Sequence, residues 1–104
     1  MARFDVHANP EVSERKQTPY FLDVQNDFID TLNTRVVIPL RREKEFGPKA
    51  RNLNPVVAVG TDNVVLDTAA LGAVPVSELR KPVANLRHDS AAILEALDTL
   101  FGAY

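Results

Sequence analysis

Short runs of branched and aromatic residues occupy much of the chain and predict strands. Residues 3–7 alternate in chemistry with a period of two, which is typical of a short, half-buried strand. Residues 20–24 and 35–40 are aromatic or branched and predict two more strands. Because Pro39 cannot donate to a ladder, we expect the third strand to end, bulge or lie at an edge there. The polar segment 11–18 lacks periodicity and predicts a mobile loop.

A β-hairpin is the clearest local signal in the sequence. Two β-branched runs, residues 56–59 and 64–67, flank the turn-forming residues 60–63. Residues 67–73 are ambiguous, because short apolar runs do not separate helix from strand. Residues 74–76 contain a proline and predict an extended segment.

The end of the sequence predicts a helix. Its apolar positions fall on one stripe of a helical wheel: Ile93, Leu94, Leu97, Leu100 and Phe101. We expect Asp89 or Ser90 to cap the start by accepting a backbone N–H. Gly102 stands where a helix commonly ends, and Glu95 and Asp98 should face water.

These elements predict a mainly β fold with a C-terminal helix, in the α+β class. Four to six short strands are followed by one helix, and a length of 104 residues fits a single domain over residues 1–104. A small twisted antiparallel sheet or partial barrel, with the helix packed on it, buries both apolar faces economically.

Composition and charge narrow the function classes. The net charge of −2 argues against a protein that coats nucleic acid, and no apolar run approaches a membrane span. The absence of cysteine excludes disulfides and thiolate metal sites, and the charged N-terminus does not resemble a signal peptide. We therefore expect a cytoplasmic protein. The basic stretch 35–51 is interrupted by acids and is interpreted as a solvated loop.

Few side chains point to catalysis or metal binding. The sequence has no phosphate-binding glycine loop, and His7 and His88 are interpreted as surface or capping residues rather than metal ligands. Asp23, Asp27 and Asp30 permit acid–base chemistry if they converge, since the first two would share a face of a strand. The alternative is turn chemistry, with Asn26 and the aspartates capping nearby backbone N–H groups.

Two further features remain open at this point. Arg41 or Arg42 together with Glu43 or Glu45 would permit RNA cleavage if these side chains converge in space. The second feature is the apolar pair Phe28-Ile29, which lies within a polar turn. This pair either folds back into the core, which we favour for Ile29 more than for Phe28, or forms an exposed interface.

Several segments, in order, resemble the CcdB family of toxins that poison DNA gyrase. They are FLDVQNDFIDT at residues 21–31, RVVIPL at 35–40, NPVV at 54–57, AVPV at 73–76 and ILEALD at 93–98. The resemblance covers the chain from Phe4 to its end, and the combination of DVQ-x-D, VIPL and VPV in this order is specific.

The resemblance implies a fold and a mechanism. The fold is an SH3-like barrel of antiparallel strands with a small three-stranded side sheet and a terminal helix, assembled as a two-fold homodimer. The implied function is that of a toxin in a toxin–antitoxin system that binds the DNA gyrase A subunit and traps the gyrase–DNA cleavage complex. It does so without catalytic residues, cofactor, metal or sequence-specific nucleic-acid binding of its own. A CcdA-like antitoxin neutralises such toxins with a disordered segment that orders on binding.

The resemblance also implies the contact residues. Gyrase binding falls on Asn26, Phe28, Ile29, Glu95, Asp98, Phe101, Gly102, Ala103 and Tyr104. Antitoxin binding falls on Ala8, Asn9, Glu11, Ser13 and Arg15, together with the same helix face.

The end of the chain departs from the family pattern. The best-known members end in Trp-Gly-Ile where this chain has Gly102-Ala103-Tyr104, and carry amides where it has Glu95 and Asp98. Two alternatives therefore stay open. One is a ribonuclease of the MazF/Kid kind on a related barrel, which Arg35, Arg41, Arg42 and the carboxylates of residues 23–30 would permit. The other is a homologue that binds antitoxin without poisoning gyrase.

Overall fold

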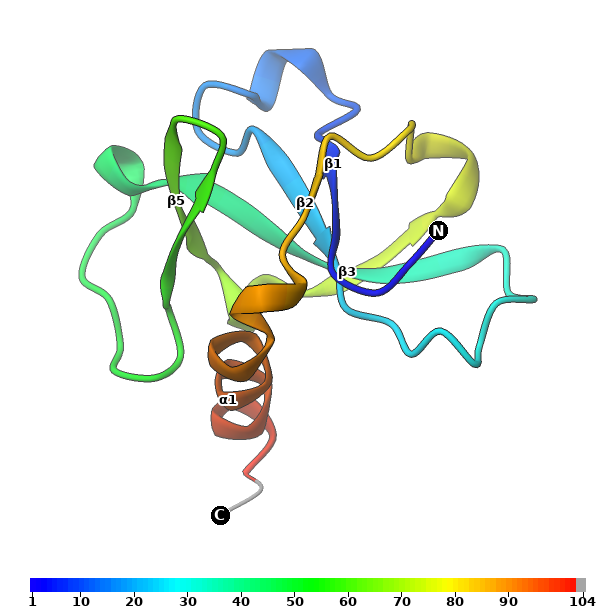
Figure 1. Ribbon diagram of the computed structural model, residues 1–104. Helices are drawn as coiled ribbons and strands as arrows, with labels where there is room; N and C mark the ends of the chain where they lie inside the picture. The colour runs from blue at the N-terminus through cyan, green and yellow to red at the C-terminus, as the bar shows by residue number, and fades with distance from the viewer. Residues whose placement is uncertain (103–104) are drawn as a thin grey trace.

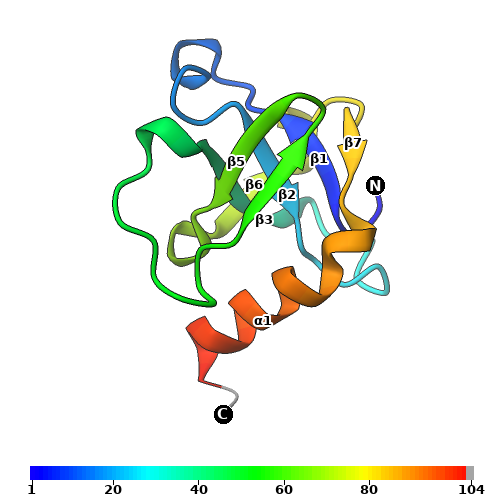
Figure 2. The same ribbon diagram turned by 60° about the vertical axis from the view of Figure 1, so that its left-hand side comes forward.

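Antiparallel strands form one sheet that curls into a nearly closed barrel in the computed structural model, which describes residues 1–102 (Figures 1 and 2). The sheet order is β4-β5-β3-β2-β1-β7, and β6 pairs with β3 beside this path. The strands are β1 (Asp5–Ala8), β2 (Tyr20–Asp23), β3 (Thr34–Arg42), β4 (Val56–Val59), β5 (Asp62–Leu66), β6 (Gly72–Pro75) and β7 (Ala84–Asn85). The helix α1 (Ser90–Phe101) lies against one end of the barrel (Figure 2). The predicted fold class is confirmed.

The long strand β3 connects the barrel to its extra strand. Its first half pairs with β6, as in Val37 with Gly72, and its second half pairs with β5, as in Leu40 with Leu66. The strand does not end at Pro39, as one form of the prediction had it, but continues to Arg42. Pro39 pairs with Phe21 of β2, and its carbonyl accepts the N–H of Asp67 at 3.0 Å on the side away from β2. The N and C=O of a strand residue face the same side, so the N–H that Pro39 lacks would also point away from β2. Pro39 lies between the part of β3 that pairs with β6 and the part that pairs with β5, so no ladder hydrogen bond is lost.

The hairpin is confirmed, with a tighter turn than predicted. Val59 pairs with Asp62, so only Gly60 and Thr61 connect β4 to β5. Gly60 has φ +59°, a left-handed conformation that glycine adopts without strain. The ambiguous segment 67–73 resolves into a 3₁₀ turn (Thr68–Ala70) and the start of β6.

The core lies inside the barrel and is closed by α1. Its buried side chains are Phe4, Val6, Leu22, Val24, Ile38, Leu40, Val57, Val59, Val64, Leu66, Leu86 and Ile93. Of the apolar side chains predicted to share one side of the helix, Ile93 is fully buried and Leu97 packs partly against the core. Leu94 and Phe101 are instead 38% and 71% exposed, because α1 touches the barrel along one narrow side.

The ends of α1 are formed differently. Asp89 occupies the N-cap position, but its side chain makes no capping hydrogen bond, and Ser90, the other predicted cap, is the first residue of the helix. A 3₁₀ turn (Arg87–Asp89) leads directly into the helix instead. At the other end Gly102 adopts φ +73° and donates its N–H to Asp98 at 2.9 Å, which confirms the predicted stop. No helix within residues 1–102 is long and apolar enough to cross a membrane.

Polar contacts of Asp62 connect the β4–β5 hairpin to β2 through Tyr20 and to β3 through Arg42. The Tyr20 hydroxyl donates to Asp62 Oδ2 at 2.7 Å, and Arg42 Nη1 contacts Asp62 Oδ1 at 3.1 Å. The hydrogen bond from Tyr20, supported by Arg42, lowers the pKa of Asp62 below its usual 3.8. Burial, reinforced by Asp62, raises the pKa of Tyr20 above its usual 10.0.

We expect replacement of Ile93 by alanine to lower the free energy of unfolding by about 2–5 kcal/mol, because it leaves a cavity in the core. Leu94→Ala, on the exposed side of the same helix, is the control and should cost much less. Urea unfolding of the two variants makes the comparison, and equal losses would contradict the assigned helix orientation.

We expect Tyr20→Phe to destabilise the protein by about 1 kcal/mol near pH 7, a value reduced for partial exposure of the pair. When the pKa of a carboxyl group is lower in the folded than in the unfolded protein, its ionised form stabilises the fold at pH values above the unfolded-state pKa. This stabilisation is lost as the pH falls through the folded-state pKa. The difference between wild type and variant should therefore shrink below about pH 3.8, and also above about pH 10 as the tyrosine ionises. Urea unfolding across this pH range measures it, and a constant difference would contradict the assignment.

Candidate functional site

A buried ion pair marks the place where β2 ends and the following loop begins. Asp23 is fully buried and Arg35 is 3% exposed. Arg35 Nε lies 2.7 Å from Asp23 Oδ2, and Arg35 Nη2 lies 2.9 Å from Oδ1. The acid–base chemistry considered for Asp23 is therefore not available at the surface, since its carboxylate is committed to the guanidinium of Arg35.

The loop that follows, here named the Phe28 loop (residues 26–33), begins with a tight turn. The side-chain oxygen of Asn26 accepts the N–H of Phe28 at 2.9 Å, and the carbonyl of Asn26 accepts the N–H of Ile29 at 3.0 Å. Gln25 Nε2 donates to the carbonyl of Ile29 at 2.8 Å. These bonds confirm the predicted turn chemistry of Asn26 and fix the backbone that carries Phe28.

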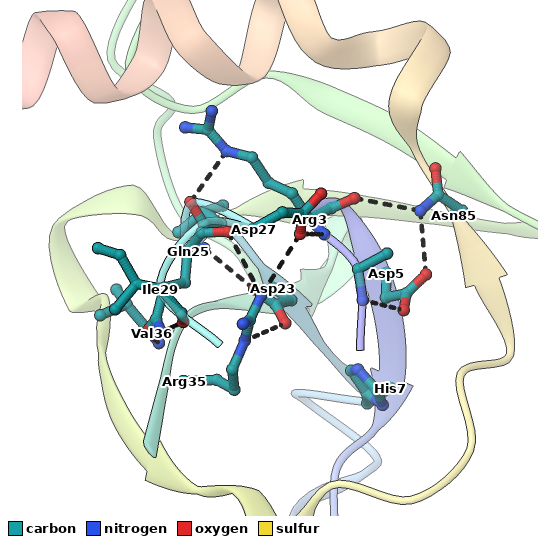
Figure 3. A network of polar contacts seen from close by, with 12 residues as sticks. Arg3, Asp5, His7, Asp23, Gln25, Asp27, Ile29, Arg35, Val36 and Asn85 are labelled. Atoms are coloured by element: carbon teal, nitrogen blue, oxygen red, sulfur yellow. Dashed lines mark hydrogen bonds and ion pairs between the residues drawn. The ribbon is translucent and has the colours of Figure 1, made fainter. Parts of the chain in front are cut away.

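The N-terminal segment holds the same loop from another side. Asp27 Oδ1 accepts the backbone N–H of Arg3 at 2.7 Å and lies 3.9 Å from Arg35 Nη2. Arg3 Nε donates to the carbonyl of Val24 at 3.1 Å. Figure 3 shows these contacts converging around Asp23, Gln25 and Asp27. Of the three predicted aspartates, Asp23 and Asp27 do come together, but as acceptors that hold the backbone and an arginine in place, and Asp30 is exposed on the loop.

The Phe28 loop presents apolar side chains to solvent. Phe28 is 96% exposed, Leu32 is 53% exposed and Ile29 is 46% exposed. The expectation that Ile29 folds back into the core is wrong, because the turn at Asn26 directs the loop away from the barrel. Leu32 was not identified from the sequence, since a single apolar residue in a polar segment carries no signal of its exposure.

The outer side of α1 carries the second group of predicted contact residues. Glu95, Asp98 and Phe101, here named the helix stripe, recur every three residues and are all exposed, as is Gly102. Ala103 and Tyr104 lie outside the described residues. The Phe28 loop and the C-terminal end of α1 lie apart in both views, so the single chain does not bring the two groups together (Figures 1 and 2).

The residues predicted to bind the antitoxin divide into structural and exposed positions. Asn9 is only 1% exposed, and its amide bridges the loop by donating to the carbonyl of Thr18 and accepting the N–H of Glu11, each at 2.9 Å. Ala8 is half-buried in β1. Glu11, Ser13 and Arg15 are exposed around a 3₁₀ turn (Val12–Glu14), although Arg15 Nε also donates to the carbonyl of Asn9 at 2.7 Å. Asn9 therefore shapes this surface from beneath.

The two histidines occupy different environments. His7 is fully buried, and its Nδ1 lies 2.6 Å from the carbonyl of Arg80, so the expectation of a surface or capping residue is wrong for it. The segment after β6 covers it, which sequence spacing does not reveal. His88 is exposed, 4.0 Å from Asp89. Within residues 1–102 no cluster of three or more potential metal ligands occurs.

The arginines considered for RNA cleavage form ion pairs with aspartates. Arg41 Nε contacts Asp67 at 2.6 Å, and Arg41 also donates to the hydroxyl of Thr18 at 3.0 Å. Arg42 contacts Asp62 at 3.1 Å. Their partners are thus aspartates of neighbouring segments rather than the glutamates suggested from the sequence.

Comparison with known families gives one finding. The family model described as CcdB protein matches residues 3–102 of the 104-residue chain. The match spans nearly the whole sequence, including both ends of the barrel and all of α1. It confirms the resemblance drawn from the sequence motifs.

Proposed function

The chain belongs to the CcdB family, the toxins of toxin–antitoxin systems, and from this premise we propose that it binds the A subunit of DNA gyrase and traps the gyrase–DNA cleavage complex. The proposal assigns it no bond-breaking chemistry, catalytic residue or cofactor. A cytoplasmic location belongs to the same proposal, since gyrase acts there.

The exposure of Phe28 is the observation that supports the proposal most directly. A phenyl ring left 96% exposed gains nothing for folding, and the hydrogen bonds of Asn26 and Gln25 hold the backbone beneath it. An aromatic side chain on an ordered backbone is a favourable anchor for a protein partner, because little conformational entropy is lost on binding. Ile29 and Leu32 extend the apolar area around it.

The helix stripe supplies a second contact area in the proposal. It lies apart from the Phe28 loop within the chain. The family resemblance implies a two-fold homodimer, which would present two copies of each area to the gyrase A subunit. We therefore include the homodimer in the proposed functional form.

A CcdA-like antitoxin is the second proposed partner. The exposed residues Glu11, Ser13 and Arg15 surround Val12, an apolar side chain that is 68% exposed. A mixed polar and apolar surface of this kind suits a segment that orders on binding. Shared use of the helix stripe would make binding of antitoxin and gyrase mutually exclusive.

The ribonuclease alternative receives less support. It relied on Arg35, Arg41 and Arg42 and on the carboxylates of Asp23, Asp27 and Asp30. Arg35 and Asp23 are buried against each other. Arg41 and Arg42 are half-buried and paired with Asp67 and Asp62. We expect no specific cleavage when the purified protein is incubated with RNA.

We expect Phe28→Ala to weaken inhibition of the cognate gyrase by about 30-fold, as for loss of a binding hot spot of about 2 kcal/mol. The measurement is the toxin concentration that blocks supercoiling and produces cleaved, protein-linked DNA. Val83→Ala removes another exposed apolar side chain, 57% exposed and outside both contact areas, and should leave potency unchanged. Unaltered potency of Phe28→Ala, or specific RNA cleavage by the wild type, would contradict the proposal.

Removal of residues 103–104 should abolish toxicity while the barrel stays folded, because this segment follows the helix stripe and belongs to the proposed gyrase contact. Expression without antitoxin, scored for growth arrest and the DNA-damage response, tests toxicity, and thermal unfolding checks the fold. Full toxicity of the shortened chain would count against the assigned contact. A wild type that binds antitoxin but arrests no growth would instead identify a homologue that has lost gyrase poisoning.

A further inference from the structure

The side chain of Gln25 joins the two segments that meet at the end of β2. Its Oε1 accepts the backbone N–H of Val36 at 3.0 Å, and its Nε2 donates to the carbonyl of Ile29 at 2.8 Å (Figure 3). Its main chain is held as well, since its N–H donates to Asp23 Oδ1 at 3.0 Å and its carbonyl accepts Arg35 Nη2 at 3.3 Å. Every polar group of this 8%-exposed residue is thus engaged.

The side-chain amide of Gln25 takes the place of the backbone acceptor that β2 would offer to β3 if the strand continued. The ladder between β2 and β3 ends at the pair Asp23–Val37, and Val24 still donates its N–H to the carbonyl of Val36 at 3.0 Å. The next donor on β3 is the N–H of Val36, and the backbone after Val24 turns away from it. A glutamine satisfies this donor and the loop carbonyl together, because acceptor and donor sit side by side on its amide.

We propose that Gln25 is a positioning residue for the surface that Phe28 and Ile29 present to the partner. This inference rests on the proposed function, since it concerns the geometry of the same contact surface. Gln25 lies beneath the Phe28 loop and acts through the carbonyl of Ile29, which it ties to β3. The loop is then ordered when the protein folds rather than when the partner binds, and this raises the affinity.

Gln25→Glu is the first test, because it keeps the size of the side chain and the acceptor for Val36 but replaces the donor with a carboxylate oxygen facing the carbonyl of Ile29. Affinity for the isolated gyrase A subunit should fall about tenfold. Amide hydrogen exchange at Phe28 and Ile29 should accelerate, while the β4–β5 hairpin remains protected. The matched control is Gln17→Glu at the other glutamine of the chain, which is exposed and outside both contact areas.

A pH series separates positioning from a general loss of structure. A protonated glutamic acid carries one O–H donor and can again bond the carbonyl of Ile29. Lowering the pH from about 7.5 to about 5 should therefore restore part of the affinity of Gln25→Glu relative to wild type at the same pH. Gln25→Met, which has no such proton, should show no recovery.

Gln25→Met also replaces Gln25→Glu in the hydrogen-exchange measurement if the charged variant does not fold.

A double-mutant cycle with Phe28→Ala completes the test. If Gln25 acts by positioning the ring, Gln25→Glu should lower the affinity much less in the Phe28→Ala background than in the wild type. An equal loss in both backgrounds, or unchanged exchange at Phe28 and Ile29 in a folded variant, would overturn the inference. If the wild type does not bind the gyrase A subunit, the proposed function fails, and the exchange measurement alone decides whether Gln25 positions the loop.

Discussion

The buried ion pair between Asp23 and Arg35 is the interaction on which the Phe28 loop depends. Moving two charges out of water is costly, and their attraction offsets that cost only when the geometry is good and the remaining polar atoms are bonded. Here Arg35 meets both carboxylate oxygens of Asp23, and the N–H of Gln25 adds a further bond to Oδ1. Loss of either partner would leave an uncompensated buried charge. The pair therefore holds the end of β2 against the start of β3 in one arrangement, and the loop leaves the barrel from that fixed point.

The N-terminal turn connects this point to the root of the helix. Phe4 has φ +72°, an unusual conformation for an aromatic residue. It is held there by its N–H, which donates to the carbonyl of Asp23 at 2.7 Å, and by its carbonyl, which accepts the N–H of Leu86 at 2.9 Å. Its ring is buried in the core, which offsets the backbone strain. Because Leu86 leads into α1 and the neighbouring Arg3 binds Asp27, the Phe28 loop and the helix are built on the same part of the core although their contact areas lie apart.

The sequence predicted those features whose causes are local. The β4–β5 hairpin follows from branched residues around Gly60, and the end of α1 follows from Gly102, since each requires only neighbours in the chain. Burial decided by distant segments was not predictable. His7 is covered by the segment at Arg80, and the course of β3 through Pro39 depends on where β5 and β6 pair. Likewise, Asp23 and Arg35 were considered as catalytic candidates, because their spacing of 12 residues does not show that the two side chains meet. The predicted contact residues came from the family resemblance, and the exposure of Phe28 is what the structure adds to that prediction.

The proposed function requires a surface of fixed shape rather than a reactive group, and the polar residues near the Phe28 loop fit that requirement. Gln25, Asn26 and Asp27 all direct side-chain atoms to backbone groups of this loop or its neighbours. None of these bonds would be needed if the loop became ordered only on contact with a partner, because an exposed polar loop can hydrogen-bond to water at little cost. Their joint effect is to carry Phe28 outward on a backbone that is already in place. The exposed ring is thus compatible with a stable fold, since the buried core that stabilises the barrel does not include it.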